Sequence, residues 1–131
     1  MEDKQRHEAG MKARRAVLGE AYVNRSVANR NPFTTEFQDM ITRYAWGEIW
    51  TRPGLERGTR SLITLSMLIA LNRDEEFRLH IRSARNNGVT REQIKELLLQ
   101  SAIYCGVPAA NQAFRSANEV FAEMDKEGTV V

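Results

Sequence analysis

The chain has 131 residues, of which 42% are hydrophobic and 27% charged, as is usual for a single globular domain. Its net charge of +2 is too small to indicate binding to nucleic acid by phosphate neutralisation. One cysteine excludes a disulfide framework, a CxxC redox pair and a cysteine-rich zinc site. The apolar runs are far shorter than a membrane span of about 20 residues, and the first residues lack the apolar core of a signal peptide. We therefore expect a soluble cytoplasmic protein that does not bind membranes.

Two helices are expected in the first third of the chain. Residues 1–9 are charged and are expected to be loosely ordered, with a first helix over about residues 3–27 that ends before Pro32. A second helix is capped by Thr34 or Thr35 and ends near Gly47, and the Pro53-Gly54 turn signal then predicts a loop. Apolar residues at i, i+3, i+4 and i+7 make the second helix amphipathic, and they are Phe37, Met40, Ile41 and Tyr44.

The stretch of residues 46–88 organises the rest of the chain. A helix from about Glu56 to Leu71 is apolar around most of its circumference, so we expect it to be the central helix, buried in a core or an interface. The next helix runs to about residue 86. Asn72 stands three positions before Glu75, a variant of the capping box that predicts its start, and residues 87–88 (Asn-Gly) predict a left-handed stop.

Two further helices are expected at the end of the chain. A second capping box, Thr90 with Gln93, opens the first of them. Its expected buried face consists of Ile94, Leu97, Leu98, Ser101, Ala102 and Cys105. The last helix follows the break at residues 106–108 and carries a seam of mainly small residues: Ala109, Ala110, Ala113, Ala117, Val120 and Phe121. Residues 125–131 are expected to form a loose tail. No strand pattern is present, so we predict an all-α single domain over residues 1–131 with about six helices.

His80 is the only histidine expected inside the folded part of the chain. Helical spacing places it on the inner face of its helix with Phe77, Ile81 and Ala84. Two interpretations stay open for its imidazole. It is either a core histidine that is hydrogen-bonded to a neighbour, or a general acid or anion-stabilising group, because the ordinary pKa of histidine lies near neutrality.

A cluster of arginines and tryptophans precedes the long apolar helix. Arg52 and Arg60 either form surface ion pairs or bind a carboxylate. Trp46 and Trp50 either pack under a loop or form the wall of an apolar pocket. Glu48 lies between them, where it is expected to pair with an arginine or with His80. No metal-ligand spacing and no glycine-rich phosphate loop occur, so neither a metal nor a cofactor is expected.

Two segments carry a family resemblance: WTRPGLERGTRSL at residues 50–62 and YCGVPAA at residues 104–110. Together with NNGVT at residues 86–90, they make the chain resemble the carboxymuconolactone decarboxylase and alkyl hydroperoxidase D-like superfamily over about residues 37–124. The resemblance implies an all-α helical bundle of the alkyl hydroperoxidase D-like kind. It also implies a homo-oligomer, specifically a hexamer assembled as a trimer of dimers.

The resemblance implies a lyase that decarboxylates 4-carboxymuconolactone to the β-ketoadipate enol-lactone without a cofactor, in the breakdown of the aromatic compound protocatechuate. The substrate would be a small dicarboxylate lactone. His80 would donate a proton or stabilise the developing oxyanion, Glu48 would orient His80 or a cation, and Arg60 and Arg52 would bind carboxylates. The residues implied for the site are therefore His80, Glu48 and Arg60 as catalytic residues and Arg52, Trp46, Trp50 and Tyr104 as substrate-binding residues.

The peroxidase branch of this superfamily carries a CxxC pair, but this chain has Arg73 and Glu76 at those two positions, and Ser61 where that branch has a glutamate. No thiol peroxidase activity is therefore expected, because it needs a thiolate and a resolving thiol. Three alternatives remain. One is a related enzyme that acts on another small lactone or acid. The second is a non-catalytic helical assembly module, which predicts a buried and fully hydrogen-bonded His80 with no pocket beside it. The third is a helix-turn-helix regulator, which is disfavoured because Glu92 and Glu96 would face the phosphate backbone.

Overall fold

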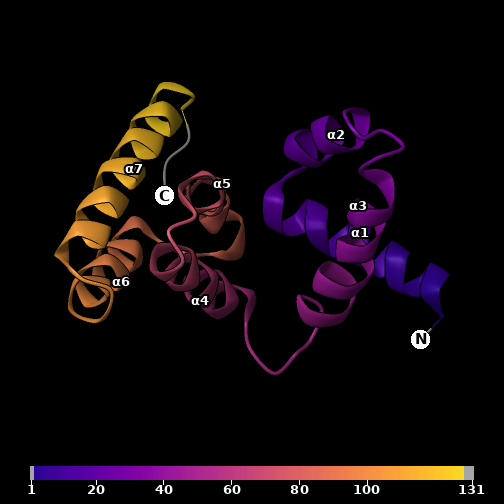
Figure 1. Cartoon of the computed structure of the whole chain (residues 1–131), viewed down its shortest axis with the longest axis horizontal. Coiled ribbons are helices and arrows are strands. Elements are labelled where there is room, and N and C mark those ends of the chain that lie inside the picture. Colours follow the sequence, from indigo (N-terminus) through magenta and orange to yellow (C-terminus); the bar gives the residue numbers. More distant parts are fainter. Residues whose placement is uncertain (1, 129–131) are drawn as a thin grey trace. The chain divides into compact units, whose positions relative to one another are not determined.

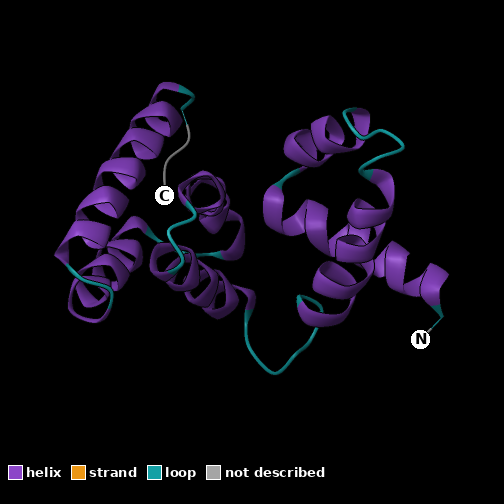
Figure 2. Ribbon diagram, in the orientation of Figure 1, coloured by secondary structure: helices purple, strands orange, loops and turns teal. Residues whose placement is uncertain are grey.

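The computed structural model describes residues 2–128, and every regular element among them is a helix (Figures 1 and 2). This confirms the all-α class. In chain order the elements are α1 (Asp3–Leu18), α2 (Glu20–Ala28), α3 (Thr35–Ile41), the π-helix η1 (Thr42–Ile49), α4 (Arg57–Ala70), α5 (Asp74–Ser83), the 3₁₀ helix η2 (Ala84–Asn87), α6 (Arg91–Tyr104) and α7 (Val107–Lys126). Within residues 2–128, none of these helices is long and apolar enough to cross a membrane.

The chain divides into two compact units, residues 1–57 and residues 58–131. The N-terminal unit contains α1, α2, α3 and η1, and the C-terminal unit contains α4 to α7 with η2. Each unit has its own buried apolar residues, and each is described by itself below. That residues 1–131 form a single domain stays a prediction.

In the N-terminal unit, the backbones of α1 and η1 pack directly against each other. A Cβ atom at Gly10 would lie 1.9 Å from the carbonyl oxygen of Thr42, and a Cβ atom at Gly47 would lie 2.4 Å from the carbonyl oxygen of Arg6. Only glycine allows an approach this close, because any side chain would enter the space of the facing backbone. These two contacts hold η1, which carries two of the predicted site residues, against α1.

The first helix begins at Asp3 as predicted, but its first turns are better ordered than expected and it ends earlier. Residues 3–9 are helical rather than loosely ordered, because Glu2 and Gln5 form a capping box at the start of α1. The predicted single helix over residues 3–27 is also wrong, since Gly19 has φ 95° and separates α1 from α2. A positive φ of this size is incompatible with a continuous right-handed helix, and only glycine adopts it at little cost.

The second predicted helix continues beyond its expected end as η1, with Trp50 N–H bonded to the carbonyl oxygen of Ala45 at 3.0 Å. The loop therefore begins after Trp50 rather than after Gly47. A π-helix has wider turns than an α-helix, so the residues that face α1 change along η1. The amphipathic face predicted from Phe37, Met40 and Tyr44 is 45–58% exposed, and Trp46 and Trp50 are buried instead.

In the C-terminal unit, α4 to α7 contribute to one apolar core. Buried residues of this core include Leu65 and Ile69 of α4, Phe77 and Ile81 of α5, and Leu98 of α6. The predicted inner face of α6 and the small-residue seam of α7 are confirmed in part, since Leu97, Ala102, Cys105, Ala109 and Phe121 are only half-buried. Their buried members are Ile94, Leu98 and Ser101 in α6, and Ala110, Ala113, Ala117 and Val120 in α7.

The long apolar helix α4 buries only one stripe of its surface in this unit. Ser61, Leu65 and Ile69 are buried at intervals of four residues, whereas Met67 is 58% exposed and Leu71 is 63% exposed. Burial in a core is therefore confirmed for this stripe alone, and burial of the remaining apolar side in an interface stays a prediction. The reason is geometric, because α5, α6 and α7 cover one side of α4 and leave its other side open.

The predicted helix ends in the C-terminal unit were partly correct. The Thr90–Gln93 capping box and the left-handed Gly88 (φ 78°) are confirmed. The capping box predicted from Asn72 is wrong, since Asn72 has φ 63° and Arg73 is the N-cap of α5. The last helix runs to Lys126, beyond the predicted start of the tail, and the remaining tail residues 129–131 lie outside the described residues.

Candidate functional site

The residues predicted for the site belong to both units. Trp46, Glu48, Trp50 and Arg52 lie in the N-terminal unit, and Arg60, His80 and Tyr104 lie in the C-terminal unit. Each group is described within its own unit. The structure brings the two tryptophans into direct contact, and it places Glu48 in an ion pair with a residue that the sequence analysis did not select.

Trp46 and Trp50 stack on each other inside the N-terminal unit. Their ring centroids are 5.2 Å apart, their planes meet at 27°, and the two residues are only 7% and 9% exposed. Offset stacking of this kind is a favourable geometry for aromatic pairs. Within this unit the two indoles therefore serve as core residues of η1, since one face of each ring is covered by the other ring.

Glu48 extends from η1 to the guanidinium group of Arg6 in α1, and the two form an ion pair through the Nε atom of Arg6. Arg6 also binds Asp3 at 2.7 Å, and its guanidinium lies over the ring of Tyr44, 5.4 Å from the centroid. The hydrogen bond that Arg6 donates to the carboxylate of Glu48 raises the pKa of Arg6, so this residue remains a cation. Pairing of Glu48 with an arginine was one of the two expected arrangements.

Arg6 was missed because residues 1–9 were expected to be loosely ordered. A signal for it was present in the sequence, since Asp3 and Arg6 stand at i and i+3, where opposite charges meet on a helix. Of the two arginines that were predicted, Arg52 lies in the exposed loop and donates its backbone N–H to Ile49 at 3.1 Å. Arg60 is half-buried near the start of α4.

His80 is half-buried on the inner side of α5, next to the core residues Phe77 and Ile81. Its Nδ1 atom is buried and has no hydrogen-bond partner among the described residues. Burial lowers the pKa of His80, and the nearby charge of Glu76 opposes that effect without overcoming it. The imidazole is therefore neutral at neutral pH, and the fully hydrogen-bonded histidine of the non-catalytic interpretation is not what the structure contains.

An open groove of about 860 Å³ lies between α4 and α6 in the C-terminal unit. Leu62 and Ser66 line it from α4, and Leu97, Tyr104 and Cys105 line it from the α6 side. Tyr104 is 82% exposed, and His80 is not among the residues that line the groove. The sequence analysis left open whether Tyr104 and Cys105 face a pocket, and the structure places both of them at this groove.

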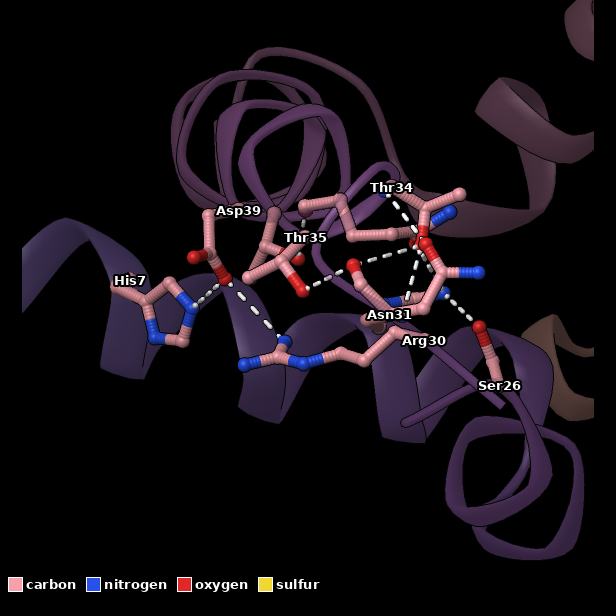
Figure 3. A network of polar contacts seen from close by, with 10 residues as sticks. His7, Ser26, Arg30, Asn31, Thr34, Thr35 and Asp39 are labelled. Carbon is pink, nitrogen blue, oxygen red and sulfur yellow. Dashed lines mark hydrogen bonds and ion pairs between the residues drawn. The ribbon is translucent and has the colours of Figure 1, made fainter. Parts of the chain in front are cut away.

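A second histidine belongs to the folded part of the chain, contrary to the prediction that His80 is the only one. His7 Nε2 lies 3.3 Å from Asp39 Oδ1, and Arg30 approaches the same oxygen at 3.3 Å (Figure 3). Nearby, the side-chain oxygen of Asn31 accepts the backbone N–H of Thr34 at 3.1 Å. This network links α1 to α3, and it was missed because residues 1–9 were expected to be loosely ordered.

Comparison with known proteins gives matches over most of the chain. The model of the carboxymuconolactone decarboxylase family matches residues 35–119. A 4-carboxymuconolactone decarboxylase of Acinetobacter baylyi is 51% identical over 95% of this chain and 92% of its own length. A nitrosuccinic acid decarboxylase of Metarhizium robertsii is 43% identical over 91% of this chain and 83% of its own length.

A 48-residue match to a 4-carboxymuconolactone decarboxylase of Pseudomonas putida, 56% identical, covers 37% of this chain and all of the relative's length. The matched family region includes every predicted site residue. Together with the all-helical fold, these matches extend well beyond the two motif segments on which the resemblance was first based. The chain belongs to the carboxymuconolactone decarboxylase family.

Proposed function

We propose that this protein is a carboxy-lyase that converts 4-carboxymuconolactone to the β-ketoadipate enol-lactone, a step in the breakdown of protocatechuate. The observation that carries this proposal is the 51% identity to the Acinetobacter baylyi enzyme over 95% of the chain. The chemistry needs no electron sink from the protein. When the ring carbon loses CO2, the electrons of the broken C–C bond delocalise through the ring double bond onto the lactone carbonyl oxygen. The resulting dienolate then takes a proton from water on the ring carbon next to the carbonyl, which gives the enol-lactone.

The protein then has to stabilise the negative charge that develops on that oxygen. We assign this task to His80, whose pKa is lowered by burial. A neutral imidazole that carries its proton on Nε2 donates a hydrogen bond to the enolate-like oxygen. A preorganised donor of this kind contributes about 10²–10³ in rate. The lowered pKa favours this role over that of a cationic proton donor, which was the other role considered for His80.

The remaining predicted residues receive roles in binding. Arg52 and Arg60 are proposed to bind the two carboxylates of the substrate, since guanidinium groups form bidentate pairs with carboxylates. The tighter of the two should hold the side-arm carboxylate, because tight binding of the departing carboxylate would stabilise the ground state and oppose the loss of CO2. Glu48 is proposed to orient a cation, as it does with Arg6.

Tyr104 and the two tryptophans are proposed to contact the apolar part of the substrate. Support for Tyr104 comes from its place at the α4–α6 groove. Trp46 and Trp50 stack on each other, and both are less than 10% exposed within their unit. Their contribution would be to keep η1 rigid, so that Glu48 and the following loop start from a fixed position.

We further propose that the protein is cytoplasmic, needs no cofactor or metal and assembles as a homo-oligomer, a hexamer built as a trimer of dimers. The exposed apolar side of α4, with Ile63, Met67 and Leu71 at 38–63% exposure, supports association of copies. No nucleic-acid or membrane partner is proposed, because the net charge is only +2.

A second candidate substrate is nitrosuccinic acid, because the nitrosuccinic acid decarboxylase of Metarhizium robertsii is 43% identical over 91% of the chain. The two substrates share their chemistry. Each is a small diacid that loses CO2, and the electrons of the broken C–C bond can move onto an oxygen atom. In the lactone this oxygen belongs to the conjugated carbonyl group, and in nitrosuccinic acid it belongs to the nitro group. One oxyanion-stabilising group therefore serves both reactions.

The test is a direct assay of the purified chain. The lactone is generated enzymatically in the cuvette, the protein is added with a metal chelator and without cofactor, and both loss of substrate and release of CO2 are followed. Turnover of the lactone with kcat/KM well above that for nitrosuccinic acid is expected. Turnover of nitrosuccinic acid alone would replace the first substrate by the second, and turnover of neither would contradict the proposed function.

A further inference from the structure

Ser61 differs from the other buried serines of the C-terminal unit. The hydroxyl groups of Ser83 and Ser101 donate to the carbonyl oxygens four residues earlier, each at 2.8 Å, and that of Ser116 donates to Asp74 at 2.5 Å. The hydroxyl of Ser61 is buried, since the residue is 1% exposed, yet it makes no hydrogen bond within the described residues. A buried hydroxyl without a partner costs about 1–3 kcal/mol, so its presence needs an explanation.

The other side chain of interest is His80, because its buried Nδ1 atom also lacks a partner. The two residues stand on helices whose buried faces enter the same core. Ser61 continues the stripe of Leu65 and Ile69 on α4, and His80 neighbours Ile81 on α5. One buried hydroxyl and one buried ring nitrogen are therefore left without partners on two helices of one core.

The start of α4 is fixed against the end of the α5–η2 segment. A Cβ atom at Gly58 would lie 3.0 Å from the carbonyl oxygen of Asn87. Ser61 follows Gly58 by about one helical turn, and His80 precedes Asn87 by about two turns. The two partnerless groups thus lie on the two segments that meet at this contact, and they make no direct hydrogen bond to each other.

We propose that Ser61 is a positioning residue for His80, and that one buried water joins the hydroxyl of Ser61 to Nδ1 of His80. This proposal rests on the proposed function of His80. The hydroxyl donates to the water, and the water donates to Nδ1. Because Nδ1 is then a hydrogen-bond acceptor, the proton of the neutral imidazole is held on Nε2, the nitrogen that donates to the developing oxyanion.

The tautomer is the feature that this arrangement controls. A neutral imidazole with its proton on Nδ1 would present a lone pair at Nε2, which repels an oxyanion instead of stabilising it. No covalent bond is made or broken at Ser61 or at the water. The bridge therefore changes how well the transition state is stabilised and leaves the binding of the substrate unchanged, so its loss should lower kcat and leave KM as it is.

The first test does not depend on turnover. The ¹⁵N resonances of the His80 ring are recorded for the protein and for the Ser61→Ala variant, and the His80→Gln variant assigns them. We expect the acceptor resonance of Nδ1 to move toward that of a nitrogen without a hydrogen bond when the hydroxyl is removed. An unchanged Nδ1 resonance in a folded Ser61→Ala protein would overturn the proposal while leaving the proposed function untouched.

The second test is kinetic and has a matched control. Ser61→Ala should lower kcat about ten-fold, the effect of one lost hydrogen bond, with KM unchanged. Ser83→Ala removes an equally buried hydroxyl whose partner is the carbonyl oxygen of Leu79, and it should leave kcat within two-fold. Equal kcat values for the two variants would overturn the proposal. If Ser61→Ala does not fold, Ser61→Cys is measured instead, and its weakly donating thiol should give the same loss of kcat.

Discussion

The carbonyl oxygen of Thr42 occupies the position next to Gly10 where any other residue would carry its Cβ atom, since a Cβ built there would lie only 1.9 Å away. This contact joins the middle of α1 to the first residue of η1. Because η1 carries Trp46 and Glu48, the position of both side chains depends on a glycine that lies 32 positions earlier in the chain than Thr42.

The Gly10→Ala substitution should therefore be strongly destabilising. A methyl group at 1.9 Å cannot be accommodated unless α1 moves away from η1, and overpacking of this kind costs about 1–3 kcal/mol. Urea denaturation should show a lower free energy of unfolding for Gly10→Ala. Gly54→Ala is the control, because a Cβ at Gly54 meets no atom within 4 Å. Equal stability of the two variants would contradict the close packing of α1 on η1.

Asp74 gives a prediction of how stability depends on pH. Its burial opposes ionisation, but the hydrogen bonds from Ser116 and Arg78 and the charge of Arg78 outweigh this and lower the pKa below its ordinary 3.8. A carboxylate with a lowered pKa stabilises the fold above that ordinary value, and the stabilisation is lost as the pH falls through the lowered pKa.

The Ser116→Ala variant tests this linkage. It should be less stable than the original chain by about 1.5 kcal/mol at pH 7, the effect of a hydrogen bond to a charged group, and the difference should shrink below about pH 4. Ser66→Ala is the comparison, because its hydroxyl donates to the carbonyl oxygen of Leu62 and no carboxylate is involved. A stability difference for Ser116→Ala that stays constant from pH 7 to pH 3 would refute the role given to Asp74.

Glu76 should control the pH at which activity appears. Burial lowers the pKa of His80 from 6.5, and the charge of Glu76 partly restores it. If the neutral imidazole is the active form, kcat rises as the pH increases through the pKa of His80, at a pH below 6.5. The Glu76→Gln variant removes the charge that raises this pKa, so the rise in kcat should move to lower pH. A kcat that falls, instead of rising, as the pH increases through this range would contradict the assignment of the neutral form.

Cys105 should be dispensable for the reaction. It lies at the α4–α6 groove, it is the only cysteine in the chain, and no step of the proposed decarboxylation uses a thiol. Cys105→Ser should keep kcat within about two-fold, and neither protein should reduce hydroperoxides, because a thiol peroxidase needs a second thiol to resolve the oxidised one. A loss of decarboxylation in a folded Cys105→Ser protein would indicate thiol chemistry at the groove.

The parts of the fold that were predicted correctly depend on local signals. The start of α6 follows from Thr90 and Gln93, which satisfy each other's backbone groups within one turn, and the stop at Gly88 needs only a residue that tolerates positive φ. The parts that were predicted wrongly depend on contacts between distant residues. The order of residues 3–9 and the π-helix η1 depend on the packing of α1 against η1 at Gly10 and Gly47, and the apolar periodicity of neither segment indicates this packing.

The features of the candidate site that were predicted correctly also depend on local spacing, and those that were missed depend on contacts between distant residues. The inner position of His80 followed from the spacing of Phe77 and Ile81, and it was confirmed at the level of helix faces. The ion pair of Glu48 with Arg6 joins residues 42 positions apart. The sequence therefore predicted only that Glu48 pairs with an arginine or with His80, and it did not identify Arg6. That the buried polar atoms of Ser61 and His80 lack hydrogen-bond partners can be recognised only when the positions of all their described neighbours are known.

The most direct test of the central claim is the turnover of 4-carboxymuconolactone by the His80→Gln variant. Glutamine keeps much of the size of the side chain and lacks the imidazole, and circular dichroism and thermal melting establish that the variant is folded. If His80 stabilises the developing oxyanion, kcat should fall about 10²–10³-fold with little change in KM. A folded His80→Gln protein that retains full turnover would contradict the catalytic role of His80.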